Sequence, residues 1–107
     1  DVPRMVTSLL ATTKALQEAL RLWSLRQVSE QHVSDVYVRL GADFNATVTA
    51  FQYYNIDLSD LYSTPENLRR VLDACLRDEP SPRVLAVHMP RVKQIIYSLL
   101  QGLLGKQ

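Results

Sequence analysis

Features that mark several other classes of protein are scarce in this sequence of 107 residues. Three glycines and five prolines leave few residues for the many tight turns of an all-β fold. The single cysteine, Cys75, excludes an internal disulfide, and we expect a buried free thiol in a reducing compartment such as the cytoplasm. No segment approaches the roughly 20 apolar residues that a membrane-spanning helix needs. A formal net charge of +1 gives no reason to predict nucleic-acid binding.

What the sequence does contain is the composition of an ordinary globular domain. Hydrophobic residues make up 47% of the chain and charged residues 21%, which is enough apolar material for one modest core. The length predicts a single domain over residues 1–107. Because the sequence begins at Asp1 and its apolar pattern still runs at the last residues, we expect a fragment of a longer protein.

Apolar residues recur at alternating intervals of three and four along the first half of the chain. This pattern predicts one helix from about Pro3 to Arg26 and a second from about Glu30 to Tyr54, with Ser29 as the N-cap of the second. Two such helices joined by a few residues are typical of an antiparallel hairpin. The first seam contains Val6, Leu9, Thr13, Leu16, Leu20 and Trp23, and the second contains Val33, Tyr37, Leu40, Phe44, Thr47, Phe51 and Tyr54.

Prolines divide the second half of the chain. A connector over residues 55–63 precedes a third predicted helix over about 64–77. The prolines that follow predict a short helix over about 81–88 and a last helix that begins at Pro90. No strand pattern is visible, so the predicted fold is all-α: an antiparallel helical bundle of four main helices plus one short helix.

Gly41 interrupts the most distinctive stretch of the chain, the segment VSDVYVRLGADFN from Val33 to Asn45. Glycine in the middle of a helix costs about 1 kcal/mol relative to alanine. A glycine kept at this cost indicates either the close approach of another backbone or a bend in the helix.

Residues that could carry out chemistry are few and scattered. His32, His88 and Cys75 are the only soft metal ligands, and they lack the close spacing of a zinc site. The glycines are isolated and form no phosphate-binding loop. Carboxylates around the connector are more typical of helix caps and a solvated loop than of an acid and base pair. We therefore predict no metal, no cofactor and no enzymatic activity.

Several apolar residues fall off the helical seams and give the strongest signal for interaction. Those left uncovered by other helices would mark a surface for a partner or for a second copy of the chain. Bases around the third predicted helix and at the start of the last one could form one basic face, although a solvated face balanced by neighbouring acids is the simpler explanation. The bases are Arg69, Arg70, Arg77, Arg83, Arg91 and Lys93, and the acids are Asp73, Asp78 and Glu79. The predicted partner-binding residues are Leu22, Leu25, Val38, Tyr53, Arg69 and Arg70.

A series of short motifs gives the chain a family resemblance. TK-x-L-x-x-x-L-x-x-W spans Thr13 to Trp23, VSD-x-YV-x-LG-x-DF spans Val33 to Phe44, and D-x-S-D spans Asp57 to Asp60. P-x-x-LR-x-VL follows over Pro65 to Leu72, and Met89 stands where the pattern has leucine, ahead of an aliphatic helix and a final KQ. Over most of its length the chain resembles the amino-terminal domain of the fungal actin-interacting, bud-site-selection proteins of the polarisome.

The resemblance implies a non-enzymatic scaffold of polarised growth that works with actin, formins and cortical polarity factors. In that family, actin-monomer delivery and formin binding are associated with the carboxy-terminal part, which this sequence does not contain. The resemblance therefore implies docking and localisation at the cell cortex, bud tip and bud neck. It identifies no binding residues.

These observations favour a docking module for protein partners of the polarity and actin machinery, with a homodimer as one form it could take. The competing hypothesis is direct binding to microtubules, actin or an anionic membrane through the basic face, so membrane contact stays open. Salt separates the two hypotheses, because screening weakens basic-face binding while apolar docking survives it.

Overall fold

The computed structural model describes residues 1–106, so Gln107, which ends the KQ motif, lies outside the described part. The described residues form four α-helices and one short 3-10 helix, with no strand among them. The predicted all-α fold is therefore confirmed. The elements are α1 (Val2–Ser24), α2 (Glu30–Tyr53), the 3-10 helix η1 (Ser59–Leu61), α3 (Thr64–Leu76) and α4 (Pro82–Leu104).

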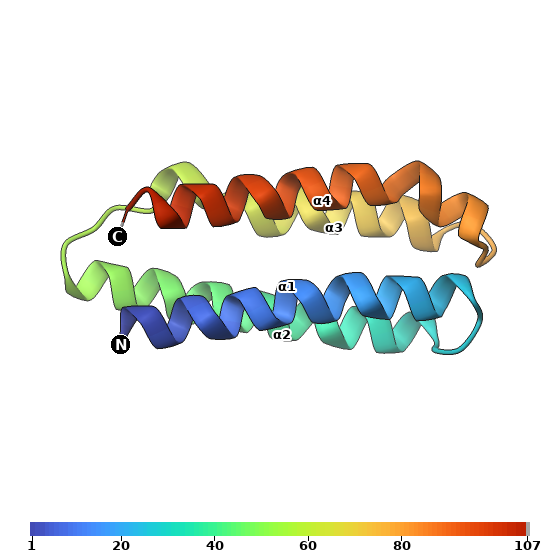
Figure 1. Cartoon of the computed structure of the whole chain (residues 1–107), viewed down its shortest axis with the longest axis horizontal. Helices are drawn as coiled ribbons and strands as arrows, with labels where there is room; N and C mark the ends of the chain where they lie inside the picture. The colour runs from blue at the N-terminus through green and yellow to red at the C-terminus, as the bar shows by residue number, and fades with distance from the viewer. Residues whose placement is uncertain (107) are drawn as a thin grey trace.

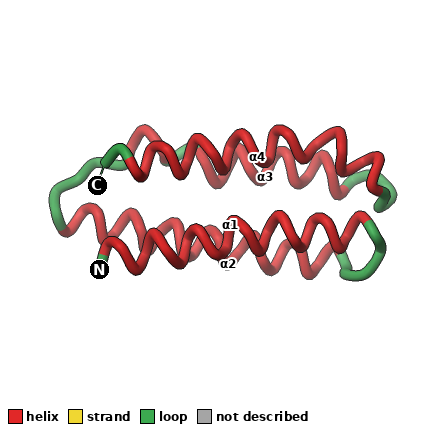
Figure 2. The backbone as a smooth tube through the Cα atoms, in the orientation of Figure 1, coloured by secondary structure: helices red, strands yellow, loops and turns green. Residues whose placement is uncertain are grey.

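The helices form two layers, each made of one antiparallel hairpin (Figure 1). α1 and α2 make one layer and α3 and α4 make the other, and all four run along the long axis of the molecule. The loops lie at the two ends of the bundle (Figure 2). The Cα atoms extend over 44 × 19 × 16 Å, and both chain ends lie at the same end of this rod.

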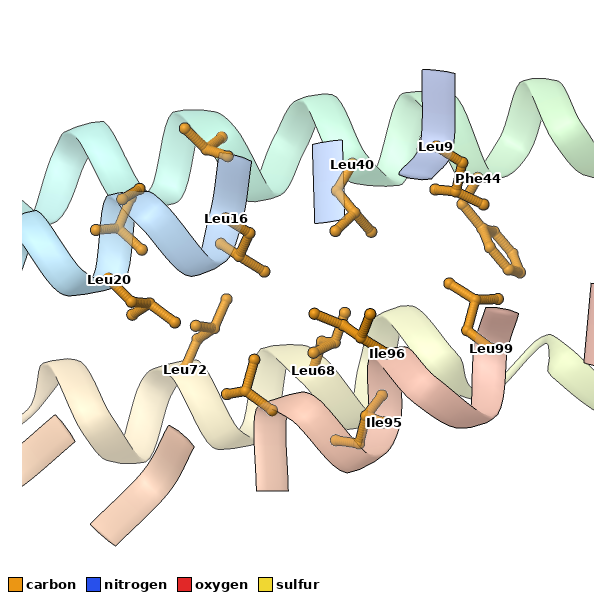
Figure 3. Close-up of a cluster of buried hydrophobic side chains, with 14 of the residues drawn as sticks. Leu9, Leu16, Leu20, Leu40, Phe44, Leu68, Leu72, Ile95, Ile96 and Leu99 are labelled. Carbon is orange, nitrogen blue, oxygen red and sulfur yellow. The ribbon is translucent and has the colours of Figure 1, made fainter. Parts of the chain in front are cut away.

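The core lies between the two layers. The side chains that meet there are Leu16, Leu20, Leu40 and Phe44 from the first hairpin and Leu68, Leu72, Ile96 and Leu99 from the second (Figure 3). Burying each aliphatic side chain stabilises the fold by about 1.5–3 kcal/mol. The predicted seams are largely buried, but Tyr37 is only half-buried. Tyr54 is 59% exposed because α2 ends at Tyr53, before the last predicted position.

Local side-chain caps and left-handed residues set the boundaries of the helices. Ser29 caps α2 as predicted, since its Oγ accepts a hydrogen bond of 3.1 Å from the backbone N–H three residues later. Ser81 caps α4 in the same way, also at 3.1 Å. Arg26 and Asn55 adopt positive φ values of 61° and 59° just after α1 and α2, where the chain leaves the helix.

The predicted break before the last helix is wrong. The predicted short helix over residues 81–88 is the beginning of α4, which continues through Pro90. Proline at this position removes one hydrogen bond within the helix and is normally a strong break signal. Leu85 before it and Val92 after it are both buried, so packing against the core holds the two parts in one helix.

The close-approach explanation for Gly41 is also wrong. A Cβ atom at this position would have no heavy atom within 4 Å, and α2 runs through the glycine without interruption. Close approach occurs instead at Gly102 on α4. A Cβ there would lie 2.6 Å from Cδ2 of Leu61, so the absence of a side chain lets η1 pack onto α4.

Candidate partner-docking groove

α2 and α3 leave a groove of about 300 Å³ between them. Helix α2 contributes three residues of the distinctive VSDVYVRLGADFN segment, and α3 contributes four. Leu72 is buried at the base of the groove, whereas Val38 is 66% exposed. We call this feature the α2–α3 groove, and its lining residues are Ser34, Tyr37, Val38, Arg69, Leu72, Asp73 and Leu76.

Tyr37 ties the two walls of the α2–α3 groove together. Its hydroxyl donates a hydrogen bond of 2.5 Å to the backbone carbonyl of Pro65, in the first turn of α3. Burial raises the pKa of Tyr37 above its ordinary value, the nearby Arg69 opposes this rise, and Glu66 and Asp73 reinforce it. The hydroxyl therefore stays protonated at neutral pH and remains a donor to the carbonyl.

One charged pair lies on the rim of the groove. Arg69 Nε is 3.9 Å from the Asp73 carboxylate, and the side chains are 66% and 62% exposed. An exposed pair of this kind contributes about 0–1 kcal/mol to stability. Both charges are therefore available to pair with complementary groups on a bound protein.

The structure brings together only two of the six predicted partner-binding residues. Val38 and Arg69 face the same groove from opposite walls. Leu22 is half-buried on α1, and Leu25 is 43% exposed in the turn after α1. Tyr53 is 81% exposed at the far end of α2, where its ring stacks edge-to-face on Tyr54 with centroids 5.1 Å apart.

The predicted basic face is divided between two helices. Arg70, the sixth predicted residue, lies 3.7 Å from Glu66 one turn earlier on α3, and Arg69 has the Asp73 partner described above. Further exposed bases, Arg83, Arg91 and Lys93, lie on α4. Arg69 and Arg70 therefore have local acidic neighbours, and basic-face attachment stays a prediction.

Tyr37 belongs to the second predicted seam, and Leu72 and Leu76 follow helical spacing on the third predicted helix. The sequence marks Asp73 only as an acid near the arginines, and it gives no signal for Ser34. The seam residues are chemically suited to a core and to a groove floor alike. Which of these they become depends on how far apart α2 and α3 lie, and periodicity does not encode that distance. The half-polar character of tyrosine was the one available signal, because a seam tyrosine needs a partner for its hydroxyl.

The soft metal ligands do not come together. Residues 1–106 contain no group of three or more His, Cys, Asp or Glu side chains placed to hold a metal ion. Cys75 is buried, and burial, assisted by the charge of Asp78, raises the pKa of its thiol to about 11. The thiol is therefore protonated at neutral pH, which makes it a poor nucleophile and a poor metal ligand.

Among the helices of residues 1–106, none combines the length and the hydrophobicity that a bilayer crossing requires.

Comparison with known proteins identifies the family of the chain. No curated protein and no solved structure gives a significant match. The match is to a family model described as the Aip3p/Bud6 N-terminal domain, and it covers residues 3–107. This confirms the resemblance carried by the short motifs. Because nearly the whole sequence is matched, the chain belongs to the Aip3p/Bud6 N-terminal domain family.

Proposed function

We propose that this domain is a non-enzymatic docking and localisation module of a polarisome scaffold that regulates actin- and formin-dependent polarised growth. Membership in the Aip3p/Bud6 N-terminal domain family supports a role in cell polarity and actin regulation. The observation that carries the docking role is the α2–α3 groove, because it holds an exposed aliphatic residue, Val38, above an apolar floor. In this proposal the partner is a protein of the polarity and actin machinery, met at the cortex of the bud tip and bud neck.

The chemistry of the groove suits a protein partner. Its floor of Leu72 and Leu76 can receive an aliphatic or aromatic anchor, and a volume of about 300 Å³ has room for one or two such side chains. Arg69 and Asp73 on the rim offer one charge of each sign to the partner. An apolar centre with a charged rim is the usual arrangement of a docking surface between proteins.

Crosslink mapping with the chain of residues 1–107 tests the proposed site. Polarity and actin-machinery proteins would be captured on the chain, and the crosslinked residues identified for each bound protein. Val38→Glu places a charge over the apolar floor, so we expect it to weaken capture about tenfold or more. Ala46→Glu introduces the same charge at another exposed position of α2 and should bind normally. Crosslinks confined to surfaces outside the groove, with normal capture by Val38→Glu, would contradict the proposal.

Localisation and ionic strength give two independent readouts. In polarised fungal cells the tagged Val38→Glu protein should lose enrichment at the cortex, bud tip and bud neck, while Ala46→Glu keeps it. Apolar docking should persist at 1 M salt, where the Debye length falls to about 3 Å. Binding that disappears at this ionic strength would instead favour attachment through the basic residues.

A further inference from the structure

The outward face of α4 is unusually poor in charge along its centre. Exposed residues recur there at intervals of three and four, opposite the buried positions of the same helix. Val87 is 70% exposed, Tyr97 65% and Leu104 60%, which places them among the most exposed large hydrophobic side chains of residues 1–106. We call this row the α4 stripe, and its residues are Val87, Pro90, Gln94, Tyr97, Gln101 and Leu104.

The charges around the α4 stripe have one sign. The sequence contains no aspartate or glutamate after Glu79, so α4 itself carries none. Arg83 precedes the stripe by one turn, and helical geometry places Arg91 and Lys93 on its two edges. Within residues 1–106 none of these three bases forms an ion pair, and Arg91 donates only to Gln94, at 3.0 Å.

Acidic groups on the elements packed against α4 already lie beside other bases. On α3, Glu66 lies 3.7 Å from Arg70, and Asp73 is paired with Arg69 as described above. Glu18 of α1 lies with Lys93 along the groove between α1 and α4, but its carboxylate is 2.6 Å from Arg21. Asp60 of η1 lies 3.0 Å from Lys106. An ordinary solvent-facing helix surface mixes charges of both signs, so this surface differs in having an apolar centre and only basic edges.

We propose that the α4 stripe docks an acidic amphipathic helix of a partner protein. The spacing of the stripe is that of a helix-packing seam, and its length from Val87 to Leu104 is about 26 Å at 1.5 Å per residue. Apolar residues of the partner helix would cover Val87, Tyr97 and Leu104, and its acidic flanks would pair with Arg91 and Lys93. The stripe glutamines can hydrogen-bond across such an interface.

Two other occupants fit the same surface less well. A second copy of the chain would bring Arg83, Arg91 and Lys93 against the same bases, with no acid on either face to balance them. An anionic membrane would attract the three bases only weakly, and Gln94 and Gln101 would interrupt the apolar residues that enter the lipid. The surface is separate from the α2–α3 groove, so its failure would leave the proposed role of that groove intact.

A charge-swap selection with the chain of residues 1–107 tests this inference. The probe is a displayed library of amphipathic peptides, four heptads long, with glutamate or lysine randomised on the flanks. We expect the chain to select glutamate-flanked peptides, and Tyr97→Glu to weaken their binding at least tenfold. The double variant Arg91→Glu/Lys93→Glu should instead prefer lysine-flanked peptides. Ala46→Glu, at an exposed position of α2 outside both surfaces, is the control and should bind the selected peptides normally.

All the altered positions are exposed, so circular dichroism and melting curves should match those of the unmodified chain. A selection with no preference for acidic flanks, or one unaffected by Tyr97→Glu, would overturn the inference. So would a concentration-dependent dimer that Tyr97→Glu abolishes, which would identify a second copy as the occupant. Binding to phosphatidylserine vesicles that Tyr97→Glu abolishes, in the absence of any selected peptide, would identify a membrane instead.

Discussion

Two glycines inside long helices have opposite surroundings. Gly41 on α2 faces open space, whereas Gly102 on α4 touches the end of the Leu61 side chain. Each glycine destabilises its helix by about 1 kcal/mol relative to alanine. Only at Gly102 is this cost offset by packing, because the missing side chain lets Leu61 of η1 pack against α4.

Replacing each glycine by alanine should therefore change stability in opposite directions. Gly41→Ala should raise the free energy of unfolding by about 0.5–1 kcal/mol, since it meets no neighbour. Gly102→Ala should lower it, since Leu61 has to move away from the new methyl group. Urea denaturation of both variants measures the difference. Equal stabilisation by the two substitutions would show that Leu61 yields without cost.

Trp23 is the largest side chain of the first predicted seam, and it is 2% exposed. Trp23→Ala should lower the free energy of unfolding by about 3–5 kcal/mol, because it removes buried area and leaves a cavity. Thermal melting followed by circular dichroism measures this loss. A variant with unchanged melting but lost partner binding would instead make Trp23 a contact residue.

Predictions at single positions succeeded where a residue depends on its own helix. The seam leucines were identified because helical periodicity alone places them inward. The surroundings of Gly41 were not predicted, because the space beside a glycine depends on which other elements pack there. Val38 was recognised as lying off the seam, but its groove required the position of α3.

At the scale of the helices, α4 shows how packing overrides a local break signal. Pro90 has no backbone N–H to donate to the helix, so one hydrogen bond of α4 is missing. Buried residues on both sides nevertheless keep α4 continuous. Four helices and the Ser29 cap were predictable from spacing and capping chemistry. The continuity of α4 was not, because it depends on a core shared with the other hairpin.

Pro90→Ala should stabilise the domain. The substitution restores the backbone N–H donor, and Pro90 is exposed, so little packing is lost. We expect the free energy of unfolding to rise by about 1–3 kcal/mol, partly offset by the greater freedom of the unfolded chain. Chemical denaturation measures the gain. A loss of stability would show that α4 needs a local distortion at this position.

At the scale of the whole molecule, two hairpins share one core, and the α2–α3 groove runs between them along one side. The hairpin of α1 and α2 follows from the short turn between two long helices, which the sequence predicts. The pairing of α3 with an unbroken α4 was not predicted. The α2–α3 groove does not follow from these pairings, because its width depends on how the longer connector lets α3 settle against α2. The candidate site is therefore less predictable than the fold that supports it.

The buried thiol of Cys75 and the half-buried phenol of Tyr37 make the stability of the domain sensitive to alkali. Burial raises the pKa of Cys75 from 9.0 to about 11, and it also raises the pKa of Tyr37 above 10.0. The folded state therefore keeps protons that the unfolded chain releases, so stability is complete below pH 9 and falls as pH rises toward 11.

Urea denaturation at a series of pH values measures this alkaline loss of stability. Cys75→Ala should be less stable at every pH, because it leaves a small cavity, but its stability should fall less steeply above pH 9. Parallel curves for the two proteins would mean that the thiol is solvated in the folded state.

The shared position of the chain ends has a mechanical consequence. Asp1 and Lys106 line one apolar pocket at the end of the rod, and α1 and α4 run antiparallel away from it. Tension between the two ends would therefore peel the layers apart turn by turn, breaking a few contacts at a time instead of shearing the whole interface at once. A domain pulled at these two ends would therefore yield at low force.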